Sequence, residues 1–262
     1  LLLKSGSIKF AGEKMYLDAL NFTYGTTPIY FDASLKNYFS QNPNFNAMLS
    51  TNIDEVAADR LINPYLTYPL KVRGELRLKG RIRGDLNNYS VISYLNLPKD
   101  TDITYMGANA GDTEYDREFE IKSDFTRNCA KVNSVKYIKY VHSQNNKPTP
   151  VVMLKAYGKV VSKGKNLDFD NFRIVTQNPV TAKIFNVIFK KSVLKQGLFT
   201  CDLRLFGNVT LPLAQGKISF QNIDMPLYNT RISDMNIDVG KNTIKALMQG
   251  KSFDSDVEIS AV

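Results

Sequence analysis

The chain has little of the chemistry that catalysis and metal binding need. Among its 262 residues are one histidine, His142, and two cysteines, Cys129 and Cys201. Neither cysteine has metal-ligand spacing around it, and we interpret both as partly buried thiols and His142 as a loop residue. The common nucleotide-binding, nucleophile-elbow and zinc-protease motifs are missing. The sequence therefore predicts a protein that is not an enzyme and that binds no metal or cofactor.

The sequence also lacks a long apolar run. No stretch approaches the ~20 residues that a membrane-spanning helix needs. Residues 1–4 (L-L-L-K) do not begin with methionine and are too short for a signal peptide, and residues 256–262 stop in a strand-like alternation. We therefore expect residues 1–262 to be one continuous segment cut from a longer polypeptide.

The charge is unbalanced, with a formal net charge of +9. This favours anionic partners, of which nucleic acid and anionic lipid are the obvious candidates. Residues 131–165 hold eight lysines and no acid, with Tyr137, Tyr140 and Tyr157 between them. Such tyrosines could stack on nucleic-acid bases. The lysines alternate with apolar residues, however, so a solvated strand face explains them about as well.

What the sequence does have is strict alternation. In residues 72–84 (V-R-G-E-L-R-L-K-G-R-I-R-G) every even position is apolar or small and every odd position is charged. A strand turns this pattern into one apolar and one charged face, whereas a helix would scatter the charges around its axis. Residues 118–125 alternate in the same way with a more acidic polar side. Opposite charges on neighbouring strands attract by roughly 0.2–1 kcal/mol per pair, so we expect both charged faces on one side of one sheet.

Most of the remaining chain also reads as strands joined by short turns, including residues 152–160 and 201–211, and a bulge is expected at residues 170–171. Two segments change period. Residues 54–66 predict a short helix capped by Asp54 and stopped near Pro64. Residues 179–196 predict a second helix, which would be a lid over the sheet or a cationic membrane-surface helix. The pattern fits either an open sheet or a closed β-sandwich whose apolar faces pack together.

A family resemblance rests on two stretches. The first runs from residue 44 through the helix predicted after Asp54 into residues 70–85 (L-K-V-R-G-E-L-R-L-K-G-R-I-R-G-D) and the strand after them. The second contains residues 179–189 (P-V-T-A-K-I-F-N-V-I-F), 197–211 (G-L-F-T-C-D-L-R-L-F-G-N-V-T-L), 215–224 (Q-G-K-I-S-F-Q-N-I-D) and 231–239 (R-I-S-D-M-N-I-D-V). Glycine-bearing, strand-rich repeats of this kind resemble the AsmA-like proteins, including TamB and its relatives, over most of residues 44–262.

The resemblance implies a fold, a function and a location. It implies an all-β chain whose long, mostly antiparallel sheet, with one or two short helices, curls into an open U-shaped apolar groove. Such a groove would carry phospholipid or another acyl lipid through the periplasm of a diderm bacterium. The implied partners are the inner membrane, reached through an N-terminal anchor outside this segment, and an outer-membrane protein, but no nucleic acid. The residues implied to line the groove are Val72, Leu76, Leu78, Ile82, Phe119, Ile121, Leu154, Leu203, Leu205, Val209, Leu211, Ile218 and Phe220.

An alternative of a different class remains open. The same alternation would suit a structural or adhesive β-sandwich module of a bacterial surface protein, in which the apolar faces are dry and bind nothing. The distinguishing feature is whether the apolar side of the sheet is covered by another sheet.

Overall fold

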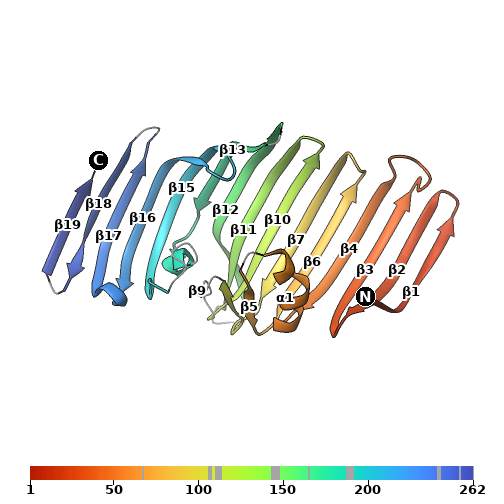
Figure 1. Ribbon diagram of the computed structural model, residues 1–262, viewed down its shortest axis with the longest axis horizontal. Helices are drawn as coiled ribbons and strands as arrows, with labels where there is room; N and C mark the ends of the chain where they lie inside the picture. The colour runs from red at the N-terminus through yellow and green to blue at the C-terminus, as the bar shows by residue number, and fades with distance from the viewer. Residues whose placement is uncertain are drawn as a thin grey trace.

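The computed structural model describes residues 1–66, 68–105, 108–109, 114–142, 148–164, 166–186, 192–240, 243–253 and 255–261. Within these residues, sixteen strands form one antiparallel sheet that runs the length of the molecule (Figure 1). Fifteen of them follow one another as β1 (Leu2–Ala11), β2 (Lys14–Tyr24), β3 (Thr27–Lys36), β4 (Asn44–Ile53), β6 (Leu76–Gly84), β7 (Asn88–Leu97), β10 (Asp116–Thr126), β11 (Cys129–His142), β12 (Pro148–Lys163), β13 (Asn166–Thr176), β15 (Gln196–Asn208), β16 (Leu213–Met225), β17 (Thr230–Val239), β18 (Ile244–Ser252) and β19 (Ser255–Ala261).

The sheet is open, with β1 at one edge and β19 at the other. Because each strand pairs with the one before it in this order, the chain is a long meander. The sixteenth strand, β14 (Val180–Thr181), pairs with the start of β15. A small second sheet contains β5 (Leu70–Arg73), β8 (Asp102–Tyr105) and β9 (Ala108–Asn109). The predicted all-β, antiparallel architecture is confirmed, and the described residues do not form the closed sandwich that the alternation also allowed.

The two charged strand faces predicted to share one side of a sheet do so. β7 lies between β6 and β10, and its pairings place Lys79 opposite Tyr94 and Tyr94 opposite Glu120. Directly opposed residues point to the same face, so the basic side of β6 and the more acidic side of β10 are on one surface. They are not neighbours, however, because β7 separates them.

The strand predicted over residues 72–84 is interrupted. Gly74 has a φ of 96°, which an L-residue rarely adopts, and it ends β5 before β6 begins at Leu76. β5 then pairs with β8 rather than with a strand of the main sheet. The continuous alternation concealed this break because Gly74 and Glu75 keep the same phase as the residues around them.

The two predicted helices have different outcomes. Helix α1 (Glu55–Leu61) forms as expected, with Asp54 as its N-cap accepting a hydrogen bond of 2.8 Å from the Ala57 N–H. A 3₁₀ turn, η1 (Asn63–Tyr65), follows it. The helix predicted over residues 179–196 is wrong at both described ends: residues 180–181 are the strand β14, η2 (Ala182–Phe185) is a 3₁₀ turn, and residues 192–195 are not helical. Residues 187–191 lie outside the described residues.

Smaller predictions were also tested. The bulge expected at residues 170–171 is present as register shifts of β13 against both β12 and β15, and Asn171 has a φ of 50°. Further register shifts occur in β1–β2–β3, in β10–β11–β12 and in β17–β18. Bulges bend the strand that carries them, so much of the sheet is built with bends. The backbone of His142 ends β11 rather than belonging to the loop.

Two clusters of buried residues hold the additional segments against the sheet. One joins α1 and β5 to the main sheet through Ile53, Ala57, Val72, Leu76 and Leu97. The other joins residues 180–186 and 192–194 to β15, β16 and β17, and within it Val180 is 1% exposed and Ala182 fully buried. Figure 1 shows α1 and β5 in front of the middle strands. The described parts of the segment predicted as a lid or a membrane-surface helix therefore pack on the sheet.

Candidate functional site

The pairing register collects apolar side chains on one side of the main sheet, which we call the apolar face. Leu78 lies opposite Leu95, Leu95 opposite Phe119, and Phe119 opposite Tyr137. The same row continues on both sides of these strands, through Phe22, Ile29, Thr51, Leu154 and Thr176. A parallel row near the C-terminus contains Cys201, Ile218, Ile237, Ala246 and Ala261. The apolar face thus extends from β1 to β19 without a break in the pairing.

The opposite side of the sheet, which we call the polar face, carries most of the charges. One row across it reads Tyr30, Ser50, Lys79, Tyr94, Glu120, Lys136 and Lys155. Farther along, the Arg173 Nη2 atom lies 2.5 Å from Asp202 Oδ2 across β13 and β15. This arrangement keeps the charged groups in water on the polar face and away from the apolar face.

Glu120 is the most buried acid of the polar face. Its carboxylate lies 2.8 Å from Lys136 Nζ and 3.0 Å from Lys122 Nζ. Burial raises the pKa of Glu120, but the hydrogen bonds from Lys136 and Lys122 outweigh it and hold the pKa below its ordinary value. The neighbouring Glu118 behaves oppositely, because burial raises its pKa more than the Tyr140 hydroxyl lowers it. These contacts are structural, and none has the geometry of an acid–base pair acting on a substrate.

Part of the apolar face is covered by the chain itself. The cluster around α1 covers Leu76 and Leu97, and Leu78, Leu95 and Phe119 pack against its edge. The cluster around residues 180–186 and 192–194 covers Phe199, Phe220 and Ile232 in the same way. In the part of the chain that the structure describes, the substantial contacts of the main-sheet strands are otherwise between sheet neighbours. The two clusters therefore cover two stretches along the strands and not the whole face.

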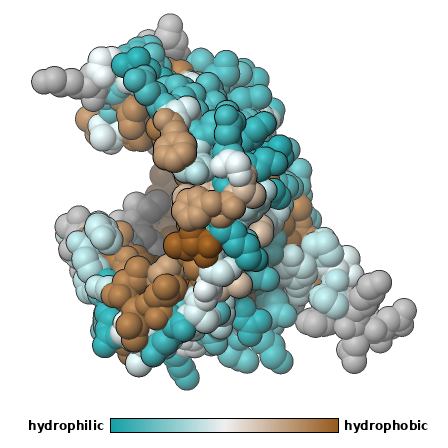
Figure 2. Space-filling view, turned by 90° about the vertical axis from the view of Figure 1, so that its right-hand side faces the viewer, coloured by the Kyte–Doolittle hydropathy of each residue, from teal (hydrophilic) through white to brown (hydrophobic). Residues whose placement is uncertain are grey.

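The rest of the apolar face has no such cover among the described residues. A line of aromatic rings crosses it, with Tyr89 and Phe125 stacked at 5.0 Å between ring centroids and Phe45 at 6.4 Å from Tyr89. Ile121, in the middle of β10, is 39% exposed. Seen from the β1 end, the molecule is hollowed on one side, with hydrophobic side chains gathered at the hollow and hydrophilic ones on the opposite side (Figure 2). Apolar side chains thus line a surface that water reaches.

The structure brings most of the predicted groove residues together. Leu78, Phe119, Leu154, Leu203 and Ile218 are half-buried on the apolar face near the two clusters. Ile82, Ile121 and Leu205 lie on the same face and belong to neither cluster. Leu76 and Phe220 also point to this face but are buried beneath the covering segments. These ten residues share the apolar face, and three of them belong to neither cluster.

Three predicted groove residues lie elsewhere. Val72 is in β5 of the small sheet, 2% exposed beneath α1, because the strand breaks at Gly74. Val209 and Leu211 belong to the turn after β15, and Leu211 is 82% exposed. The Asn208 side chain accepts a hydrogen bond of 2.8 Å from the Thr210 N–H and so stops the strand that the alternation extended to residue 211.

Several residues of the apolar face were not among those predicted. Tyr89, Leu95, Phe169 and Phe172 lie in its rows, and Met235 and Met248 join it near β19. Each stands at an apolar position of an alternating segment, which was the available signal. Alternation alone could not identify them as part of this face. It shows that a strand has an apolar side, but not on which side of the sheet that side lies once a bulge has shifted the register.

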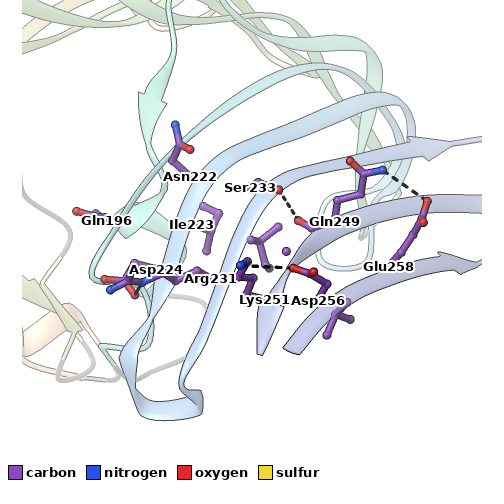
Figure 3. Close-up of a pocket in the computed structure, with 13 residues that line it drawn as sticks. Gln196, Asn222, Ile223, Asp224, Arg231, Ser233, Gln249, Lys251, Asp256 and Glu258 are labelled. Atoms are coloured by element: carbon purple, nitrogen blue, oxygen red, sulfur yellow. Dashed lines mark hydrogen bonds and ion pairs between the residues drawn. The ribbon is translucent and has the colours of Figure 1, made fainter. Parts of the chain in front are cut away.

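A cavity of about 610 Å³ lies near the C-terminal end of the sheet (Figure 3). Ile223 and Ile232 line it together with two ion-paired couples. Arg231 Nε lies 3.8 Å from Asp224 Oδ1, and Lys251 Nζ lies 3.7 Å from Asp256 Oδ1. Each cation has its own carboxylate and Glu258 also lines the cavity, so its lining carries one more acid than it has cations.

The nucleic-acid interpretation of the 131–165 segment loses its geometric basis. Tyr137 is on the apolar face, stacked on Phe119, while Tyr140 and Tyr157 are on the polar face with Glu118 and Arg173. Rings on opposite sides of one sheet cannot stack on the same strand of bases. Two lysines of this segment are also ion-paired, Lys136 with Glu120 and Lys163 with Asp168.

Comparisons and searches add few constraints. Among the described residues, no group of histidine, cysteine or acidic side chains is arranged to hold a metal ion. None of the described helices has the length and apolar composition needed to cross a bilayer. A scan of protein-family models and searches of curated proteins and solved structures found no match to this chain.

Proposed function

We propose that the main sheet curls into a U-shaped groove and that the apolar face inside it shields the acyl chains of lipids, so that the chain serves lipid transfer rather than catalysis. The observation that carries this proposal is the row from β2 to β13, which is apolar or aromatic except at Thr51 and Thr176, opposite a row of polar and charged side chains on the same strands. The resemblance to AsmA-like proteins supports the same function.

The dimensions favour a conduit over a single pocket. Fifteen strands in succession at ~4.8 Å spacing give a sheet of about 67 Å along its stacking axis. One acyl chain spans about 15 Å, half of a hydrocarbon core of ~30 Å. The apolar face therefore has room for several lipids in a row.

The energetics favour acyl chains over polar ligands. Each methylene group kept out of water contributes ~0.8 kcal/mol, so a lipid tail on this surface avoids a large hydration penalty. The headgroup would remain in water at the mouth of the groove. Ile82, Ile121 and Leu205 are the predicted groove residues that we expect to touch the tails, together with the aromatic line of Phe45 and Tyr89.

The bends and the two clusters fit this arrangement. Register shifts in strands on both sides of the centre supply the curvature that a groove requires. Helix α1 with β5, and residues 180–186 with 192–194, would act as partial covers that close the groove over two stretches and leave the aromatic line accessible.

We further propose that the parent protein works in the periplasm, held at the inner membrane by an N-terminal anchor, and passes lipid toward an outer-membrane protein. Only the resemblance to AsmA-like proteins supports this location and these partners. The proposal for the groove does not depend on them.

Native mass spectrometry of the purified chain tests the proposed function. We expect phospholipid masses to remain bound after gentle ionisation and to disappear after the protein is refolded from denaturant in lipid-free buffer. Their return after incubation with phospholipid vesicles would support exchange. Consistent absence of lipid from protein purified in the presence of membranes would favour a structural or adhesive module instead.

A further inference from the structure

The polar face of β6 is a second surface with a distinct chemistry. Its four outward positions are all cationic and exposed: Arg77, Lys79, Arg81 and Arg83. We propose that this cationic strip binds the anionic headgroup layer of a phospholipid bilayer. The proposal concerns the polar face and does not require lipid in the groove.

The strip has few acids to neutralise it. Its register partners on β4 are Asn46, Met48, Ser50 and Asn52, and those on β7 are Ser90, Ile92, Tyr94 and Asn96. The Glu75 carboxylate lies 3.9 Å from Arg77 Nε, and Asp32 on β3 lines the hollow beside Lys79 and Arg81. On β10, β11 and β13, in contrast, Lys122, Lys136 and Arg173 each have Glu120 or Asp202 within 3.0 Å. Four cations with these two acids beside them leave the strip with a net positive charge.

The size of the strip selects a surface rather than a single anion. Six residue steps separate Arg77 from Arg83, or about 20 Å at ~3.3 Å per residue. One phosphate group cannot contact cations spread over that length, whereas a headgroup layer presents many phosphates. Clusters of lysine and arginine close to a membrane surface are attracted to its anionic lipids.

Exposed tyrosine and methionine side chains lie beside the strip, where a headgroup layer bound to the strip would contact them. Tyr30 and Met48 are 53% and 47% exposed, and they line a hollow of about 480 Å³ together with Lys79, Arg81 and Tyr94. Tyrosine is well suited to a membrane interface because its ring is apolar and its hydroxyl is wet. The pairings of β3, β4, β6 and β7 contain no register shift, so no bulge bends this part of the sheet away from a flat partner.

Nucleic acid is the competing polyanion, and the geometry favours it less. A single strand of bases needs successive aromatic faces along its path. Tyr30 and Tyr94 lie on opposite sides of the strip in one cross-strand row, so they do not follow the line of cations along β6.

Vesicle co-sedimentation at low salt tests the proposal on the full chain. The probes are vesicles of phosphatidylcholine alone and vesicles with about one-third phosphatidylglycerol. We compare the double variant Lys79→Gln/Arg83→Gln with Lys217→Gln/Lys245→Gln, which removes the same number of exposed cations from the polar face near Asp238. Circular dichroism and a thermal melt establish that both variants fold.

Binding to the anionic vesicles should fall about 10- to 30-fold in the first variant and by less than about threefold in the second, because each interfacial cation contributes roughly a fivefold factor. Equal losses in the two variants would reduce the effect to net charge and overturn the proposal. No loss in the first variant, or equal binding to neutral vesicles, would also overturn it. Tighter binding to a single-stranded oligonucleotide, lost in the same variant, would assign the strip to nucleic acid. Since lipid retention in native mass spectra is measured separately, failure here leaves the proposed groove function standing.

Discussion

Phe119 and Tyr137 stack across β10 and β11 with 5.0 Å between ring centroids and 22° between ring planes. Phe119 comes from an alternating segment with a charged opposite side, and Tyr137 comes from the lysine-rich segment. Their contact shows that these two segments contribute to one apolar face. It also shows that Tyr137 serves that face and not the cationic side of its strand.

Leu205→Asp should remove bound lipid without unfolding the chain. Leu205 lies on the apolar face but in neither buried cluster, so a carboxylate there meets water or lipid rather than a packed core. We expect lipid occupancy in native mass spectra to fall at least about tenfold, since a charge cannot enter the acyl region cheaply. Arg204→Asp, one position away on the polar face, is the control and should keep its lipid. Loss of the circular-dichroism signal in Leu205→Asp would instead indicate a packed core.

Asp54→Ala should destabilise the segment that covers the middle of the sheet. The Asp54 side chain caps α1 through the Ala57 N–H, and such caps contribute about 1 kcal/mol. We expect that loss in the free energy of unfolding from urea titration. Asp54→Asn retains the capping oxygen and should lose only a few tenths of a kcal/mol. Equal losses in the two variants would show that the charge matters and the cap does not.

Glu120→Gln should destabilise the protein at neutral pH and not in acid. Because the pKa of Glu120 is lower in the folded than in the unfolded chain, its ionised form adds stability above the unfolded pKa of about 4.3. That contribution is lost as the pH falls through the folded pKa. We expect a difference of about 1–2 kcal/mol from the wild type at pH 7 that disappears once the pH has fallen through the folded pKa of Glu120. Glu13→Gln, which removes an exposed carboxylate in the turn after β1, is the control. A gap that persists undiminished in acid would contradict the assigned ion pairs.

Gly216→Ala should be far more costly than Gly80→Ala. Gly216 has a φ of 134°, and a methyl group there would lie 1.9 Å from the Asp202 carbonyl oxygen. Gly80, on the same face, has nothing within 4 Å of an added Cβ. We expect a loss of about 2–4 kcal/mol for Gly216→Ala and less than about 1 kcal/mol for Gly80→Ala in thermal or urea unfolding. Similar values for both would contradict the close strand approach at Gly216.

Local alternation was sufficient to predict which side of a strand is apolar. Residues 76–84 and 118–125 have the predicted faces, and the charged sides of β6 and β10 share one surface as expected. The attraction between neighbouring strands from which this was predicted does not account for it, because β7 lies between them. The Asp54 cap was also readable, because capping depends on residues only a few positions apart.

What could not be predicted depends on partners distant in the sequence. Val72 fits the alternation of β6 but pairs with Ile103 in the small sheet, and nothing within residues 72–84 identifies that partner. Val180 and Thr181 read as the first turn of a helix, yet pairing with Leu198 and Phe199 makes them a strand. In the candidate site, the local pattern identified the apolar positions but not which of them would be covered by α1 and by residues 180–186 and 192–194.

The most direct test of the central claim is a photo-crosslinking amino acid placed at Ile121, the exposed apolar position of β10, and at Lys122, its neighbour on the polar face. The proteins are illuminated in the presence of phospholipid carrying a radiolabelled acyl chain, and the labelled band is quantified. We predict strong labelling at position 121 and about tenfold less at position 122, because successive strand residues point to opposite faces. Equal labelling at both positions, or none at 121, would contradict an apolar face open to acyl chains.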